Sequence, residues 1–144
     1  MGRVMADTLI NEIKFHNKRG EPTRAIVPCG PACWYAPFVR RVNRDKVSLK
    51  GLFVFHMDEC LDWQGRLLPR NHPYNFRTFM EKHFYGGIPE RLAVPEEQRF
   101  FLTPRDIPFI EKEIARAPVD ITLGEGTLNE MCLSGLGIAI KTGL

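Results

Sequence analysis

The stretch Leu52-Phe53-Val54-Phe55-His56-Met57-Asp58-Glu59 carries the clearest fold signal in the chain. Its first six residues are nearly all apolar, which is the pattern of a parallel strand that is covered on both faces. Two adjacent carboxylates, Asp58 and Glu59, follow at the carboxyl end of this predicted strand. Because ligands of parallel sheets bind beyond the carboxyl ends of the strands, this pair is the first candidate for a functional site.

Further strands and helices are predicted on both sides of this stretch. Short apolar runs over residues 24–28 and 119–123 favour two more buried strands, each followed by a glycine-containing loop. Apolar residues at helical spacing predict helices between the strands, whereas residues 86–102 are expected to be irregular. The alternation of helices and strands predicts an α/β fold with a mostly parallel sheet. The predicted helices cover residues 4–19, 34–43, 75–85 and 103–115, the last with Thr103 as N-cap and Pro104 in its first turn.

Size and composition are those of one soluble globular domain over residues 1–144. The chain is 44% hydrophobic and 26% charged, and its formal net charge is only +3. Its basic residues form no long run, so a nucleic-acid partner is not expected. No window reaches the roughly 18–20 continuous apolar residues of a membrane span, and the charged N-terminus is unlike a signal peptide, so we expect a cytoplasmic protein. The four cysteines form no zinc-binding pattern, and neither a metal nor another cofactor is expected.

Three loops should converge at the carboxyl edge of the sheet: Cys29-Gly30-Pro31, Asp58-Glu59 and Gly124-Glu125-Gly126. Burial and neighbouring negative charge raise the pKa of a carboxylate, which suits a base that moves protons near neutral pH. A helix cap or a solvated pair is the structural alternative for Asp58 and Glu59. The loop at Cys29 precedes a predicted helix, where backbone N–H groups attract phosphate, but it could equally be a tight turn.

The histidines and thiols carry weaker signals. His56 lies two residues before Asp58, so strand alternation directs both side chains to the same side of the sheet. A hydrogen-bonded core histidine is nevertheless the expected outcome at that position. No histidine is placed by the sequence to activate Cys29 or Cys33, so a thiol mechanism is not favoured.

Four segments of the chain occur in one register: Val47-Ser48-Leu49-Lys50, Met57-Asp58-Glu59, His72-Pro73-Tyr74-Asn75-Phe76 and Phe79-Met80. Together they resemble the central region of the glucosamine-6-phosphate deaminase family. The resemblance covers about residues 1–123 and implies a Rossmann-like, three-layer α/β sandwich, shared with ribose-5-phosphate isomerase. Members of the family convert glucosamine 6-phosphate and water into fructose 6-phosphate and ammonia, in amino-sugar catabolism.

The resemblance also implies roles for individual residues. Asp58 would be the base that carries a proton between C2 and C1 of the sugar, and Glu59 would support it or shape the site. Glu130 would be the remaining acidic member of a third loop, near Gly124. The turn formed by Cys29, Gly30, Pro31 and Ala32 matches the family's phosphate-binding turn in position, but it lacks the usual hydroxyl donors.

The chain departs from the family in its last part. Residues 123–131 look like the family's glycine-rich signature with about five residues removed, including its ring-opening histidine, and no histidine follows His83. We therefore expect an incomplete family domain, with two alternatives to an active deaminase. One is a catalytically impaired or non-catalytic sugar-phosphate-binding protein, and the other is a 6-phosphogluconolactonase-like hydrolase. The glycine-rich apolar segment 134–140 would form an exposed edge, which makes a homo-oligomer possible.

Overall fold

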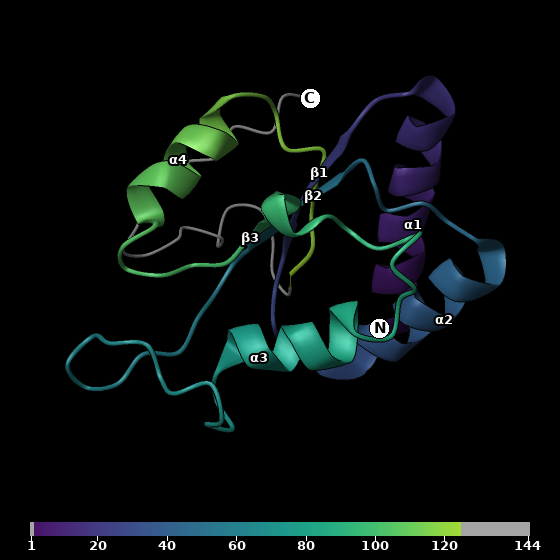
Figure 1. Ribbon diagram of the computed structural model, residues 1–144. Coiled ribbons are helices and arrows are strands. Elements are labelled where there is room, and N and C mark those ends of the chain that lie inside the picture. Colours follow the sequence, from purple (N-terminus) through teal and green to yellow (C-terminus); the bar gives the residue numbers. More distant parts are fainter. Residues whose placement is uncertain (1, 125–144) are drawn as a thin grey trace.

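Four parallel strands form the central sheet of the computed structural model, which describes residues 2–124 (Figure 1). The strand order is β3-β2-β1-β4, and β1 and β2 pair over their full length, from Thr23 opposite Leu52 to Val27 opposite His56. The two outer strands are short and pair with β2 and β1 respectively. The strands are β1 (Thr23–Val27), β2 (Leu52–His56), β3 (Arg99–Phe100) and β4 (Ile121–Thr122).

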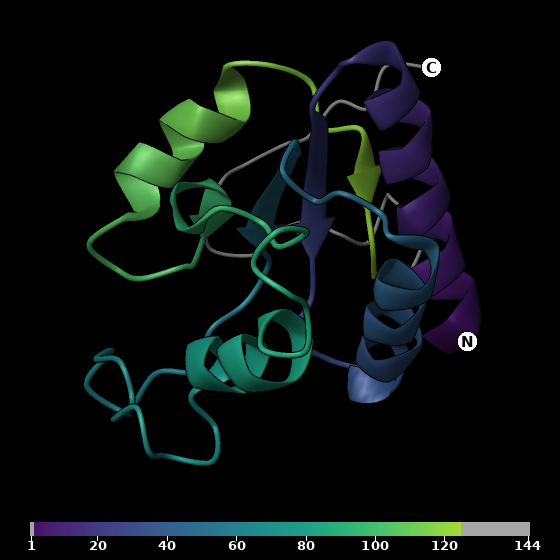
Figure 2. The same cartoon turned by 45° about the vertical axis from the view of Figure 1, so that its right-hand side comes forward.

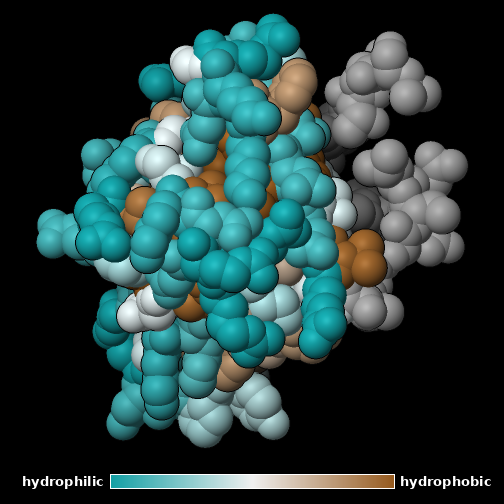
Figure 3. Space-filling model, turned by 90° about the vertical axis from the view of Figure 1, so that its right-hand side faces the viewer, coloured by the Kyte–Doolittle hydropathy of each residue, from teal (hydrophilic) through white to brown (hydrophobic). Residues whose placement is uncertain are grey.

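Helices cover both faces of the sheet, which gives three layers (Figures 1 and 2). The helices α1, α2 and α3 lie on one side, and α4 lies on the other. The outer surface over α1 and α2 is mostly hydrophilic (Figure 3). The helical elements are α1 (Gly2–Arg19), the 3₁₀ turn η1 (Ala32–Trp34), α2 (Tyr35–Asp45), α3 (Phe76–Met80), the π-helical turn η2 (Glu81–Tyr85), the 3₁₀ turn η3 (Glu96–Gln98) and α4 (Ile107–Ala115).

The apolar strands are buried on both faces because alternate side chains enter two different cores. Ala25 and Val27 of β1 pack into the larger core under α1 and α2. Ile26, between them, packs into the smaller core with Phe55 of β2 and Ile110 of α4. Helix α1 contributes one apolar stripe, Ala6, Leu9, Ile10 and Ile13, at the spacing that places side chains on one helical face.

The structure confirms the α/β class, the parallel sheet and the three predicted strands. It corrects two details. Residues 86–102 were expected to be irregular, yet Arg99–Phe100 forms the short strand β3. It pairs in parallel with Val54 and Phe55 of β2, because the edge of β2 offers backbone groups to which two residues can bond. Thr103 was expected to be the N-cap of the last helix, and this is wrong.

Helix α4 begins at Ile107, with Pro108 in its first turn. The segment before it is a separate turn, in which the Asp106 N–H donates to the Thr103 carbonyl over 3.0 Å. The Thr103 hydroxyl donates to the Asp106 carboxylate over 2.7 Å, so this threonine closes the turn instead of capping a helix. No helix among residues 2–124 is long and apolar enough to cross a membrane.

Candidate functional site

The ends of β1 and β2 are joined through Asp58. One carboxylate oxygen, Oδ1, accepts a hydrogen bond from the backbone N–H of Cys29 over 2.9 Å. Just before it, the Met57 N–H donates to the Val27 carbonyl over 2.9 Å, which extends the ladder beyond the strands. The first two loops that the sequence places at the carboxyl edge therefore do meet there.

The environment of Asp58 favours its neutral form more than water does. The side chain is half-buried, and this burial raises its pKa above the ordinary value of 3.8. The hydrogen bond from Cys29 acts in the opposite direction and is the smaller effect. A carboxylate with a raised pKa is a better proton acceptor, so the geometry and the electrostatics of Asp58 both suit a general base.

Glu59 has a different environment from its neighbour. Its carboxylate accepts backbone N–H groups from Phe76 at 2.8 Å, from Cys60 at 3.0 Å and from Arg77 at 3.1 Å. Two of these donors begin α3, whose first N–H groups have no partner inside the helix. Glu59 thus ties the start of α3 to the end of β2, and a direct catalytic role for it stays a prediction.

The loop after β1 is stabilised by a hydrogen bond from a tyrosine hydroxyl. The Tyr35 hydroxyl donates to the carbonyl of Cys29 and lies 2.8 Å from the sulfur of Met80. Gly30 is exposed, and a Cβ added there would meet no atom within 4 Å, so a ligand could approach its backbone closely. Ala32 begins η1, whereas Pro31 has no N–H to offer.

The environment of the Cys29 thiol suits a structural role and not a nucleophilic one. The side chain is buried, and desolvation raises its pKa to about 11. At neutral pH it is therefore a protonated, apolar packing group. This finding agrees with the expectation that the mechanism uses no thiolate.

The third predicted loop is only partly within the described residues. The Leu123 N–H donates to the Ile26 carbonyl over 2.9 Å, which carries the pairing of β4 with β1 toward Gly124. Gly124 thus follows β4 at the same edge of the sheet as Cys29 and Asp58. Glu130 lies outside the described residues, and its role stays a prediction.

His56 is a core residue, as expected. Its Nε2 lies 2.9 Å from the Tyr85 hydroxyl, and its ring stacks on Phe101 with centroids 4.1 Å apart. Burial, reinforced by the nearby charges of Arg77 and Arg99, lowers its pKa to about 3. The imidazole is therefore neutral at physiological pH and is committed to the packing between β2 and β3.

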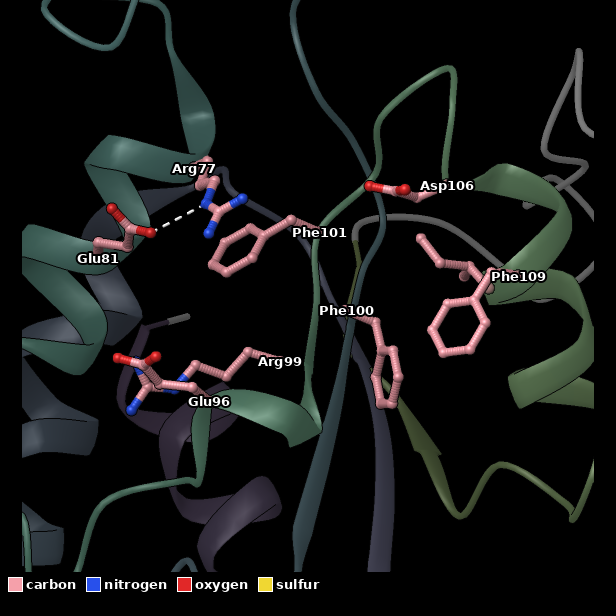
Figure 4. Close-up of a pocket in the computed structure, with 9 residues that line it drawn as sticks. Arg77, Glu81, Glu96, Arg99, Phe100, Phe101, Asp106 and Phe109 are labelled. Carbon is pink, nitrogen blue, oxygen red and sulfur yellow. Dashed lines mark hydrogen bonds and ion pairs between the residues drawn. The ribbon is translucent and has the colours of Figure 1, made fainter.

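A cavity of about 370 Å³ opens beside the edge strand β3 (Figure 4). Its walls include Arg77 of α3, Phe101 after β3 and Asp106 of the turn before α4. Neither Asp58 nor Cys29 lines it, nor does any other predicted site residue within residues 2–124. This cavity could not be predicted from the sequence, because its residues come from α3, η2, η3, β3, α4 and the segment between β3 and α4, and they form no local motif. Among residues 2–124, no three possible ligands are grouped closely enough to hold a metal ion.

Comparisons with known proteins agree with the family resemblance. No protein-family model matches the chain. Over 91 residues the chain is 31% identical to the glucosamine-6-phosphate deaminase of Aliivibrio salmonicida and 30% identical to that of Aliivibrio fischeri. Each match covers 61% of this chain but only 32% of the relative, so the chain matches about a third of the length of these curated proteins.

A solved structure shows the same fold. It is a monomeric glucosamine-6-phosphate deaminase described as a missing link of the NagB superfamily, and its TM-score with this chain is 0.59 at 14% sequence identity. The superposition covers 79% of this chain and 45% of that one. At this low identity the likeness supports the fold alone.

Proposed function

We propose that this chain is a member of the glucosamine-6-phosphate deaminase family and that it acts on an amino-sugar phosphate with Asp58 as the proton-moving base. The relatives' names suggest glucosamine 6-phosphate as the substrate. The overall reaction would take glucosamine 6-phosphate and water to fructose 6-phosphate and ammonia.

The observation that carries this proposal is the hydrogen bond between Asp58 and the N–H of Cys29. It fixes one carboxylate oxygen, Oδ1, and leaves Oδ2 without a hydrogen bond to any of residues 2–124. A base must be held within reach of the proton that it removes, and a fixed carboxylate meets that requirement. In the open-chain sugar, Oδ2 would take the proton from C2 and return it to C1 by way of an enolamine, because C2 carries the amine. Water would then hydrolyse the resulting imine at C2, which releases ammonia and leaves fructose 6-phosphate.

The phosphate would lie at the turn formed by Cys29, Gly30, Pro31 and Ala32. Backbone N–H groups at the start of a helical segment favour an anion, and this turn leads directly into η1 and α2. The exposed backbone of Gly30 allows the close approach that a phosphate needs. Glu59 would act as a positioning residue, because it holds α3 against the loop that carries Asp58.

A non-catalytic sugar-phosphate-binding protein is the second candidate, and a specific observation favours it. The histidine nearest to Asp58 in the sequence, His56, is buried, neutral and bonded to Tyr85. No hydrogen bond joins Asp58 to a histidine within the described part of the chain. Ring opening would then lack an imidazole, and one general acid or base is worth about 10²–10⁴-fold in rate.

Ammonia release from glucosamine 6-phosphate by the purified full chain tests the proposal. We expect turnover that Asp58→Asn reduces by about 10²–10⁴-fold, since the variant removes the base. Asp7→Asn is the matched control, because Asp7 is an exposed residue of α1. Turnover that Asp58→Asn leaves unchanged would contradict the assignment of Asp58.

Equilibrium dialysis with the same compound separates the second candidate from the first. Saturable binding by a chain that releases no ammonia would support the non-catalytic binding protein. If the chain showed neither binding nor turnover, both proposals would be wrong.

A further inference from the structure

The segment between β2 and α3 contains an arm, residues 60–74, that projects from the layered fold (Figures 1 and 2). Both ends of the arm are fastened to one carboxylate, because Glu59 accepts the N–H of Cys60 over 3.0 Å and the N–H of Phe76 over 2.8 Å. Arg70 of the arm also donates to Glu81 of η2. The arm therefore leaves the fold and returns to it at a single point, as compact surface loops do.

The tip of the arm is a tight turn that presents Trp63. Asp62 Oδ1 accepts the N–H groups of Gln64 and Arg66, both over 2.9 Å, and Asp62 Oδ2 accepts Arg66 Nε over 2.8 Å. Two backbone hydrogen bonds between Asp62, Gly65 and Arg66 close the same turn. Trp63 lies inside this hydrogen-bonded turn, yet it is 89% exposed. A side chain on a fixed turn loses less conformational entropy when it binds a partner.

Exposed apolar residues gather on the arm. Seven large apolar residues within residues 2–124 are exposed, and four of them belong to this segment: Leu61, Trp63, Leu67 and Tyr74. Single exposed apolar residues are ordinary, whereas a cluster of them marks an interaction surface. Tryptophan is also one of the residue types that contribute most to binding energy at protein interfaces. The arm therefore has the composition of one half of an interface.

The cavity beside β3 has the features of the other half. Phe100 and Phe109 lie on one side of the strand, and on the other side the ring of Phe101 lies against the guanidinium of Arg77 (Figure 4). Phe109 is 56% exposed there. Aromatic rings and a cation both bind an indole ring favourably. The cavity volume of about 370 Å³ lies within the range of about 300–1,000 Å³ of ligand pockets.

The arm and the cavity adjoin each other. Glu81, which lines the cavity, accepts the hydrogen bond from Arg70 of the arm, and α3, which supplies Arg77 to the cavity, begins just after the arm. A twofold dimer needs one surface that is complementary to itself, so that a projection on each copy meets a recess on the other. The net charges of the two parts are also opposite, because the arm has one carboxylate and two arginines and the cavity is lined by three carboxylates and two arginines.

We propose that two copies of the chain form a dimer in which Trp63 of each copy inserts into the cavity beside β3 of the other. The indole ring would pack on Phe100 and Phe109, and its N–H would donate to the carboxylate of Asp106, which also accepts the Thr103 hydroxyl. A buried indole N–H needs such an acceptor. A membrane surface fits the arm less well, because anionic lipids attract clusters of about 4–8 basic residues and the arm has two.

The two tryptophans of the chain make the test direct, because Trp34 is fully buried and Trp63 is exposed. A change in tryptophan fluorescence on dilution therefore reports on Trp63. The full-length protein is diluted from about 100 μM to about 0.1 μM, a range that brackets a micromolar dissociation constant, and its mass is measured by sedimentation. We expect the mass to fall from that of two chains to that of one, and the quenching of Trp63 by acrylamide to rise with the same midpoint.

Variants of the full-length protein identify the two halves of the interface. Trp63→Ala and Phe109→Ala should each weaken dimerisation about 30-fold or more, as the loss of an interface anchor does. Both side chains are largely exposed in the single chain, so the fold of each variant should be retained. Phe15→Ala is the matched control and should have no effect, because Phe15 of α1 is 55% exposed but lies outside the arm and the cavity. An equimolar mixture of Trp63→Ala and Phe109→Ala should dimerise more tightly than either variant alone, because the mixed dimer keeps one intact contact.

A monomer at every concentration would overturn the proposal, and so would a dimer that Trp63→Ala leaves intact. A mixture that dimerises no more tightly than its two components would show that the arms are not exchanged. Burial of Trp63 at the mass of a single chain would show instead that the arm covers the cavity of its own chain. Binding of the monomer through Trp63 to vesicles of phosphatidylcholine and phosphatidylserine would assign the arm to a membrane surface. None of these results depends on turnover at Asp58, so this inference and the proposed deaminase activity can fail separately.

Discussion

The carboxylate of Asp58 accepts the backbone N–H of Cys29 over 2.9 Å, although 29 positions separate the two residues in the chain. This bond ties the loop after β1 to the loop after β2. It places the proposed base beside the proposed phosphate-binding turn, and the half-burial of Asp58 raises its pKa. The same burial has a cost for folding, which leads to the first prediction.

Asp58→Asn should stabilise the protein at neutral pH. Because the pKa of Asp58 is higher in the folded state than in the unfolded one, its contribution to stability is present at low pH and is lost as pH rises. Asparagine carries no charge and keeps an oxygen acceptor for Cys29. Urea unfolding at pH 7 and at pH 4 should show a gain in unfolding free energy that is larger at pH 7. A less stable variant at pH 7 would contradict this account of the site.

Glu59 should prove to be a structural anchor. Glu59→Ala removes the acceptor of three backbone N–H groups and should cost about 1–3 kcal/mol of unfolding free energy, measured in urea. Glu59→Gln keeps one oxygen acceptor and should cost less. Glu97→Ala, at an exposed position in η3, serves as the control. If Glu59→Gln were fully stable yet abolished ammonia release, Glu59 would have a direct catalytic role.

Tyr35→Phe should loosen the loop that holds the phosphate. The variant leaves the buried carbonyl of Cys29 without its hydroxyl donor, at a cost of about 1–3 kcal/mol of unfolding free energy. Because the loop binds substrate in the proposed function, KM should rise more than kcat falls. Tyr74→Phe removes an exposed hydroxyl and should change neither quantity. An unchanged KM in Tyr35→Phe would separate this loop from the substrate site.

His56 should make the protein sensitive to acid. Its pKa is about 3 when folded and near its ordinary value of 6.5 when unfolded, so the unfolded state binds the extra proton between these values. The stabilising effect is fully present above pH 6.5 and decreases as pH falls toward 3, by at most about 1.4 kcal/mol per pH unit. Urea unfolding from pH 7 to pH 4 should show a shallower loss of stability in His56→Gln. Equal slopes in the two proteins would contradict the buried, neutral histidine.

Much of the fold follows from local pattern. The apolar run at Leu52–Met57 and the shorter one at Ala25–Val27 predict buried parallel strands, and the structure confirms both. The short strand β3 could not be predicted, because two residues have no periodicity and pair only where β2 is already in place. The predicted start of α4 was wrong for a related reason. Thr103 and Pro104 favour a helix start by residue type, but in the structure the Thr103 hydroxyl donates to the Asp106 carboxylate and closes a turn before the helix.

The sequence by itself determined the class of the fold, the position of Asp58 at a strand end and the resemblance to a family, because these depend on residue type and spacing along the chain. Only the tertiary structure decided which group each carboxylate contacts. Asp58 and Glu59 are adjacent and chemically similar, yet one receives a single N–H beside the open edge of the sheet and the other receives three. The cavity between Arg77 and Asp106 was likewise decided by packing, because these residues meet only after α3, β3 and α4 have assembled around the same strand edge.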